Sequence, residues 1–289
     1  MPEGDTVHRT AHRLTEALGG ATLTHGEIRH PRLSTVDLAG RVVLNVRPVG
    51  KHLFVRFDSD VSLHNHLRMD GGWHVYAAGE RWRRPGHQAR VVLRTAELSA
   101  IGFHLHDLAL VRTADERRLV EHLGPDLLAD DWDDRHAAEA AERLVAEPDR
   151  QLGVALLDQR VMAGIGNVYK SEACFLLGAS PWTPVGEVDA AETVRLCREL
   201  LSRNATSVVR NTTGLTRHGE ELWVYGRTRS GCLRCGGRVH AGNQGDALDR
   251  YAERITYYCP RCQRGPFPAS AEQRQARRPG SAGGPARRG

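Results

Sequence analysis

The sequence has no long hydrophobic run, no internal repeat and little net charge outside its C-terminal end. A membrane-spanning helix needs about 20 consecutive apolar residues, and the first residues here are polar and charged. We therefore expect neither a membrane span nor a signal peptide, and we place the chain in the cytoplasm. With 289 residues and a hydrophobic content of 40%, it can form two domains with separate cores.

Most of the positive charge lies in one short segment. The formal charge is +5, but residues 265–289 hold five arginines against one glutamate, so only +1 is left for the rest of the chain. Net charge alone is therefore weak evidence for binding to nucleic acid. This segment is rich in Pro, Gly, Ala and Arg and has one large apolar residue, Phe267, so we predict a disordered basic tail.

Two hydrophobic patterns divide the remaining chain into an α+β arrangement. Short apolar or alternating runs between residues 21 and 112, separated by turn-rich pieces such as RPVG and DGG, favour an antiparallel sandwich or barrel. Helical spacing predicts helices over residues 5–18, 134–147, 150–161, 167–178 and 189–210. Asp5 can cap the first helix. The acidic stretch at residues 125–134 is either a linker or an ordered loop.

Four of the six cysteines form the pattern C-x2-C-x23-C-x2-C. Two such pairs can complete a closed tetrahedral Zn²⁺ site, and the spacer has the pattern of a β-hairpin. Two disulfides are the alternative, which a cytoplasmic location disfavours. The predicted zinc ligands are Cys232, Cys235, Cys259 and Cys262. Cys174 and Cys197 lie on predicted helices, where we expect them to be buried.

Histidines recur in pairs on two predicted strands. His64 and His66 share one strand face, as do His104 and His106. No carboxylate or thiolate completes a metal pattern nearby, so we interpret them as histidines with ordinary hydrogen bonds and predict no catalytic metal.

Three features together resemble the formamidopyrimidine-DNA glycosylase and endonuclease VIII family. They are MPEG at the start, LLDQRVMAGIGNVYKSEACF in the helical half, and a four-cysteine hairpin that ends ERITYYCPRCQ. The resemblance implies a catalytic β-sandwich domain with an N-terminal helix (residues 2–115), a helix-two-turns-helix DNA-binding domain (130–218) and a zinc finger (221–264). It also implies a bifunctional DNA glycosylase and abasic-site lyase of base-excision repair, a monomer that acts on damaged double-stranded DNA in the nucleoid.

The resemblance gives the first residues a catalytic role. In this family Met1 is removed and the exposed proline nitrogen attacks C1′ of the damaged nucleotide, and Pro2 matches that proline. An α-amino group is roughly a tenth free base at pH 7, whereas an ordinary lysine is free base in about one part in a few thousand. Glu3 resembles the family's general acid/base. Without the downstream motifs, a terminal Pro-Glu would be an irrelevant overhang.

Other site residues also follow from the resemblance. Lys51, at the start of a strand, matches a lysine that contacts phosphate and takes part in β-elimination. Asn167, after Gly-x-Gly at the start of a helix, matches a phosphate contact. Arg254 matches the finger arginine that is linked to δ-elimination, and His87 matches a DNA contact. Taken alone, a lysine that opens a strand is typical of a solvated edge charge.

The segment HLRMDG matches the loop whose side chains fill the space left by a flipped nucleotide. It places Arg68, Met69 and Asp70 there, with Met69 as the best wedge. The alternative is that Met69 only closes a turn over the sandwich core.

The sequence departs from the family pattern at several points. Thr6 stands where the family commonly has a second glutamate, so the role of that carboxylate falls to Asp5, to another group, or to none. The Arg/Phe wedge loop of the formamidopyrimidine branch is absent, and residues 211–227 are too short for the loop that closes over an oxidised purine. The start PEG and these absences favour the endonuclease VIII branch and oxidised pyrimidines as substrates.

Two rival functions stay open. One is a catalytically silent zinc-finger protein that recognises damaged or abasic DNA, which the Thr6 departure would favour. The other is a zinc-ribbon interaction module fused to an unrelated β domain.

Overall fold

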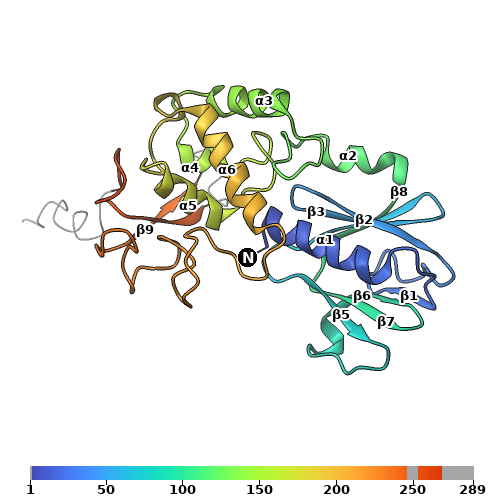
Figure 1. Cartoon of the computed structure of the whole chain (residues 1–289). Coiled ribbons are helices and arrows are strands. Elements are labelled where there is room, and N and C mark those ends of the chain that lie inside the picture. The colour runs from blue at the N-terminus through green and yellow to red at the C-terminus, as the bar shows by residue number, and fades with distance from the viewer. Residues whose placement is uncertain (1, 246–252, 269–289) are drawn as a thin grey trace, which may run out of the picture.

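The computed structural model describes residues 2–245 and 253–268, and its N-terminal half is a β-sandwich (Figure 1). Its strands are β1 (His25–Ile28), β2 (Val43–Val49), β3 (His52–Phe57), β4 (Val61–His66), β5 (Gly72–Ala77), β6 (Ala89–Arg94), β7 (Leu98–Phe103) and β8 (His106–Arg112). Antiparallel pairing gives two four-stranded sheets in the orders β1-β6-β7-β5 and β2-β3-β4-β8. The sheets confirm a sandwich and exclude a closed barrel.

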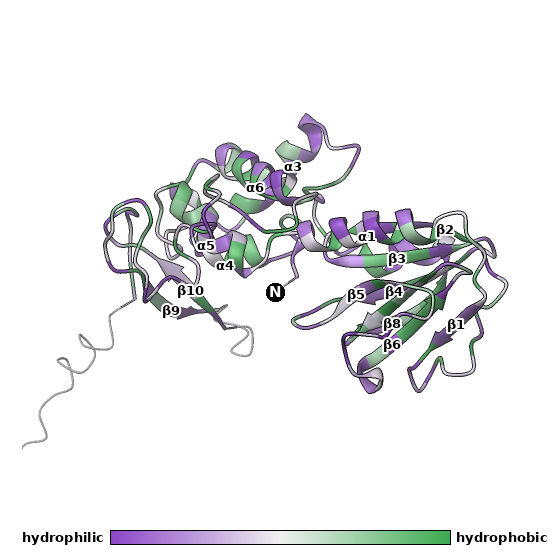
Figure 2. Ribbon diagram, turned by 60° about the horizontal axis from the view of Figure 1, so that its bottom comes forward, coloured by the Kyte–Doolittle hydropathy of each residue, from purple (hydrophilic) through white to green (hydrophobic). Residues whose placement is uncertain are grey.

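The N-terminal helix α1 (Gly4–Leu18) packs on the sandwich along its apolar face, which is predicted correctly. Figure 2 shows hydrophilic residues on the outer face of this helix and hydrophobic residues on the face toward the sheets. The predicted cap is wrong, because Glu3 and not Asp5 occupies the N-cap position, and the Asp5 side chain binds an arginine instead. The helix thus begins one residue earlier than the sequence indicates.

The second half is helical, as predicted, but all four predicted helices are shorter than expected. Its helices are α2 (Glu116–Val120), α3 (Asp134–Val145), α4 (Leu152–Leu157), α5 (Asn167–Leu176) and α6 (Ala190–Asn204). Helix α6 ends at Asn204 because that side chain bonds the backbone of Asn211 in both directions, 2.6 Å and 2.9 Å, and turns the chain back. Cys174 and Cys197 are fully buried in this core, as expected.

Residues 125–134 form an ordered loop between the two halves. The Asp126 carboxylate accepts the backbone N–H of Gly50 at 2.7 Å and of Leu128 at 3.0 Å. Leu127 is fully buried in the helical core. These contacts join the sandwich to the helical half and rule out a free linker.

The last folded part is a hairpin of β9 (His240–Gln244) and β10 (Arg254–Tyr258), in which Arg254 pairs with Gln244. The prediction of a disordered tail is wrong for its first residues, because Phe267 stacks on Tyr258 with ring centroids 4.9 Å apart. An aromatic side chain gains from this burial. Residues 269–289 of the predicted tail lie outside the described residues. Within the described ranges, no helix has the length and apolar character to cross a membrane.

Candidate active site

Glu3 is anchored on the first turn of helix α5. Its fully buried carboxylate accepts three backbone N–H groups, from Gly166 at 2.9 Å, Val168 at 2.8 Å and Tyr169 at 3.3 Å. A helix N-terminus is a favourable place for a carboxylate, because these N–H groups lack partners within the helix. Glu3 thereby links the start of the chain to a helix more than 160 residues away.

The glycines of the GIG motif make this approach possible. A Cβ on Gly166 would lie 2.4 Å from the Glu3 carboxyl carbon, so any other residue would displace that side chain. Gly164 has a φ of 113°, which favours glycine, and its carbonyl accepts the backbone N–H of Gly4 at 2.9 Å. Pro2 precedes Glu3 directly, so its position is fixed by both contacts. In both views the N-terminus lies between the sandwich and the helical half (Figures 1 and 2).

Lys51 reaches the same turn from the sandwich. Its ammonium donates a hydrogen bond to the carbonyl of Ile165, between the two glycines. Burial lowers the pKa of Lys51 to about 8, and the nearby Glu3 carboxylate opposes this shift. About a tenth of Lys51 is therefore free base at pH 7, comparable with an α-amino group. The comparison of ordinary pKa values that favoured Pro2 over lysine thus does not hold for this lysine.

Asn167 binds the finger hairpin at the residue next to Arg254. The Asn167 side-chain amide donates to the carbonyl of Ile255 at 2.9 Å, and Arg254 is the exposed neighbour of Ile255. The positive charges of Arg210 and Arg254 both lower the pKa of the Lys51 amine. Asn167 therefore holds the hairpin, and its contact with phosphate stays a prediction.

Arg210 is a member of this cluster that the sequence did not reveal. Its guanidinium binds the Asp5 carboxylate through two hydrogen bonds, 2.9 Å and 2.6 Å, and lies 3.7 Å from Glu3. It also donates to the Thr6 hydroxyl at 3.1 Å and lies 4.8 Å from the centre of the Tyr169 ring. Asp5 is therefore held in an ion pair and is not free to replace a second glutamate.

We expect Arg210→Met to lower the free energy of unfolding by about 3–5 kcal/mol, because it leaves the buried carboxylates of Glu3 and Asp5 without their cation. Urea unfolding measures the change. Arg203→Met is the matched control, since that arginine is exposed and its ion pair with Glu199 contributes about 1 kcal/mol or less. Equal losses in the two variants would contradict the role given to Arg210.

The loop after β4 presents one free apolar side chain. Met69 is 65% exposed, so it does not close over the sandwich core. Its neighbours are held by polar contacts, Arg68 by an ion pair to Asp107 at 2.9 Å and Asp70 by the His104 ring at 3.5 Å. This arrangement leaves Met69 as the candidate wedge, and the roles of Arg68 and Asp70 toward DNA stay predictions.

The histidines do not form a metal site. His64 shares a hydrogen bond of 2.8 Å with His52, and His66 accepts the backbone N–H of Arg68 at 2.9 Å, as expected of ordinary histidines. In the described part of the chain, the four cysteines are the one group of side chains placed to bind a metal. His87 is exposed in the turn Gly86–Gln88.

The cysteines have the geometry of a tetrahedral metal site. All six cysteines are free, and two pairs of sulfurs are 3.8 Å (Cys232 and Cys262) and 3.6 Å (Cys235 and Cys259) apart. Zn–S bonds of about 2.3 Å in a tetrahedron put sulfurs about 3.8 Å apart. A disulfide requires about 2.05 Å. The residues therefore fit a metal ion, which supports the predicted zinc.

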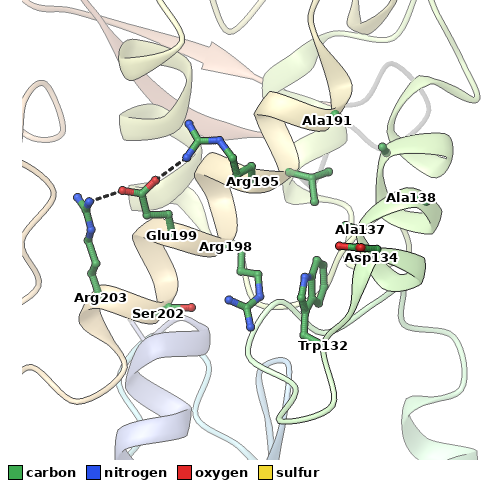
Figure 3. A pocket seen from close by; sticks show the side chains of 12 residues that line it. Trp132, Asp134, Ala137, Ala138, Ala191, Arg195, Arg198, Glu199, Ser202 and Arg203 are labelled. Atoms are coloured by element: carbon green, nitrogen blue, oxygen red, sulfur yellow. Dashed lines mark hydrogen bonds and ion pairs between the residues drawn. The ribbon is translucent and has the colours of Figure 1, made fainter.

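A cavity of about 690 Å³ lies elsewhere, between α3 and α6 (Figure 3). Trp132 and the small side chains of both helices line it, and the guanidinium of Arg198 lies 5.3 Å from the centre of the Trp132 ring. Glu3, Lys51 and Arg254 do not line this cavity. The cluster around Glu3, and not the cavity, is the candidate active site.

Comparison with known proteins agrees with this geometry. The sequence model of the formamidopyrimidine-DNA glycosylase N-terminal domain matches residues 1–122, and that of its H2TH domain matches residues 123–218. The chain belongs to the formamidopyrimidine-DNA glycosylase and endonuclease VIII family. This membership rules out a zinc ribbon fused to an unrelated β domain.

Relatives from this family cover nearly the whole chain. A probable endonuclease 8 2 of Streptomyces coelicolor is 54% identical over 93% of this chain and 96% of its own length. The DNA-(apurinic or apyrimidinic site) lyase Nei2 of Mycolicibacterium smegmatis is 48% identical over 91% and 99%. The Lactococcus lactis glycosylase bound to abasic-site DNA is 22% identical, covers 91% of this chain and 100% of its own, and has the same fold, with a TM-score of 0.74.

Family membership confirms the predicted fold and enzyme class. The chain is a base-excision repair enzyme, a DNA glycosylase with abasic-site lyase activity. The likeness to endonuclease 8 proteins supports the predicted branch.

Proposed function

We propose that the chain removes oxidised pyrimidines from double-stranded DNA through a covalent intermediate at Pro2. The observation that carries this proposal is the anchoring of Glu3 on helix α5, beside Pro2, with Lys51 reaching the same turn. The turn before helix α5 and its first residues thus bring the amine of Pro2 and the carboxylate of Glu3 together with the cation of Lys51. A monomer acting in the nucleoid is part of the same proposal.

The proposed chemistry uses the residues as follows. After removal of Met1, the nitrogen of Pro2 attacks C1′, and the glycosidic bond breaks with its electrons going to the departing base. The nitrogen passes its proton to the Glu3 carboxylate, and Glu3 delivers that proton to O4′ as the C1′–O4′ bond breaks and the nitrogen lone pair forms a charged imine at C1′. The departing base takes its proton from solvent. Loss of a C2′ proton then expels the 3′ phosphate by β-elimination. Either β- or β,δ-elimination is compatible with this scheme.

DNA is held by groups around this centre. We assign phosphate contacts to Lys51, Asn167 and Arg254, a further DNA contact to His87, and the filling of the vacated base position to Met69 with Arg68 and Asp70. Flipping a base costs a few kcal/mol, which an inserted side chain helps to offset. The structural likeness to a glycosylase bound to abasic-site DNA supports this partner. One structural Zn²⁺ holds the finger.

The short segment between α6 and the finger sets the expected substrate preference. Residues 211–221 are too few to surround a bicyclic purine, and the Arg/Phe wedge pair that holds the partner of an oxidised guanine is absent. We expect thymine glycol, dihydrouracil and abasic sites to be processed faster than 8-oxoguanine paired with cytosine. Single-turnover rates on these duplexes at one salt concentration measure the order. A preference for 8-oxoguanine would contradict it.

The rival hypothesis of a silent DNA-binding protein rests on Asp5 and Thr6, which are both bound by Arg210, and the enzyme class of the family stands against it. It predicts binding to abasic DNA without strand cleavage. The proposed enzyme predicts cleavage in the same reaction mixture, so one gel-based incision assay separates the two.

A further inference from the structure

Helix α5 carries a fully buried lysine that the proposed chemistry does not use. Lys170 lies one turn after Gly166, in the helix that holds Glu3, and its side chain is 0% exposed. Its ammonium donates to the hydroxyl of Thr256 at 2.5 Å. Thr256 is itself fully buried in β10, two residues after Arg254.

The Thr256 hydroxyl continues into a buried polar chain. It donates to the side-chain carbonyl of Gln244 at 3.1 Å. The Gln244 amide in turn donates to the side chain of Gln151 at 2.9 Å and to the carbonyl of Pro181 at 2.7 Å. Both strands of the finger hairpin are thus tied to the helical half through side chains.

The backbone of α4 leaves room for the Gln244 side chain of this hydrogen-bonded chain. A Cβ on Gly153 of α4 would lie 2.3 Å from the Gln244 side-chain oxygen, so the glycine is required for the contact. Gln244 is also the cross-strand partner of Arg254. The polar chain therefore fixes the hairpin at the residue pair that carries Arg254.

A buried ammonium is costly, and the partner that the structure gives Lys170 is the neutral hydroxyl of Thr256. Burial lowers the pKa of Lys170 to about 8, while Cys174 and then Glu3 oppose this shift and the charge of Arg254 adds to it. An apolar residue at this place would pack without that cost. Buried polar groups of this kind are retained in some proteins because they specify one arrangement of the parts they join.

We infer that Lys170 is a positioning residue that holds the finger hairpin, and with it Arg254, against the end of helix α5 where Glu3 is anchored. This inference rests on the proposed function, because it takes Arg254 as a phosphate contact. Lys170 does not touch the DNA in this account. It acts through Thr256.

The test compares Lys170→Met, Arg254→Ala and the double variant in the full-length, zinc-loaded protein. The readout is the salt dependence of binding to an abasic-site duplex, because each phosphate contact contributes about 0.9 to the slope of log K against log salt. We expect each single variant to lose about 0.9 in slope. The double variant should also lose about 0.9 in slope, because both changes remove the same contact, that of Arg254 with phosphate.

Two results would overturn the inference alone. The first is a wild-type slope in Lys170→Met. The second is a double variant that loses about 1.8 in slope, which would make Lys170 a separate phosphate ligand. An unchanged slope in Arg254→Ala would overturn the phosphate role of Arg254 and the inference with it. Arg195→Met, an exposed arginine beside the cavity in Figure 3, controls for loss of charge and should keep the wild-type slope.

Thr256→Val carries the test if Lys170→Met loses zinc or folds poorly. It removes the hydroxyl between Lys170 and Gln244 without changing the charge of the protein. We expect the same slope loss as in Arg254→Ala, with zinc content unchanged. A wild-type slope in Thr256→Val with intact zinc would overturn the inference.

Discussion

Glu3→Gln should slow base excision by a factor of about 10²–10⁴, because an amide cannot serve as the general acid/base beside Pro2. It should also lower the free energy of unfolding by about 1–3 kcal/mol. Both carboxylate oxygens of Glu3 accept backbone N–H groups of helix α5, and an amide places an NH₂ against one of these donors. Single-turnover excision and urea unfolding measure the two effects separately.

The two effects distinguish a catalytic carboxylate from a helix cap. If Glu3→Gln is destabilised but excises bases at the wild-type rate, Glu3 only caps helix α5. Thr15→Val on α1 serves as a control for stability, since its hydroxyl accepts the backbone N–H of Val46 at 2.9 Å in the sandwich. We expect it to lose about 1–3 kcal/mol and to keep its excision rate once folded.

Removing the metal should have the largest effect on structure. Apparent binding free energies of structural zinc sites are about 10–16 kcal/mol, and this energy is the folding energy of so small a module. Cys259→Ser or chelation should unfold the hairpin, expose Phe175 of helix α5, which packs against the finger, and abolish DNA binding. Metal analysis and fluorescence anisotropy with an abasic duplex measure these outcomes.

Cys197→Ala is the matched control for the metal site. This cysteine is buried in the helical core and lies outside the cluster of four, so the variant should keep one equivalent of zinc. Retained DNA binding after complete loss of metal would show that the finger does not hold Arg254 in place. Binding of an equivalent of a metal other than zinc in cells would correct the identity of the ion.

The sequence allowed the fold to be predicted where local patterns are strong. The spacing of Val7, Ala11 and Leu14 predicted the buried face of α1, and the paired Cys-x2-Cys motifs predicted the metal cluster. Strands β5 and β7 were missed, since GWHVYA begins at glycine and LSAIGF is rich in small residues. Their place in the sheet comes from tertiary pairing, since β7 pairs with β6 and β5 pairs with β7.

The site was predictable only where a motif was contiguous. Pro2 and Glu3 follow from the first residues, but nothing near them indicates Arg210, which is 205 positions from Asp5. Lys170 lies within a helical run and has no local signal that separates it from a solvated lysine. Contacts of this kind are set by tertiary packing, which periodicity does not report.

The proposed mechanism depends most on which amine attacks the sugar. Burial lowers the pKa of Lys51 to about 8, so both Lys51 and Pro2 have free base available at neutral pH. Position must therefore decide between them, and the anchoring of Glu3 on helix α5 and of Gly4 on the Gly164 carbonyl favours Pro2.

Reduction with borohydride during cleavage of an abasic duplex, followed by peptide mapping of the trapped protein, tests this claim most directly. We predict a chain that has lost Met1 and carries the adduct on Pro2, with Lys51 unmodified. Pro2→Gly should lose most base excision and keep weaker lyase activity through its primary amine. An adduct on Lys51 with Pro2 unmodified would contradict the proposed mechanism.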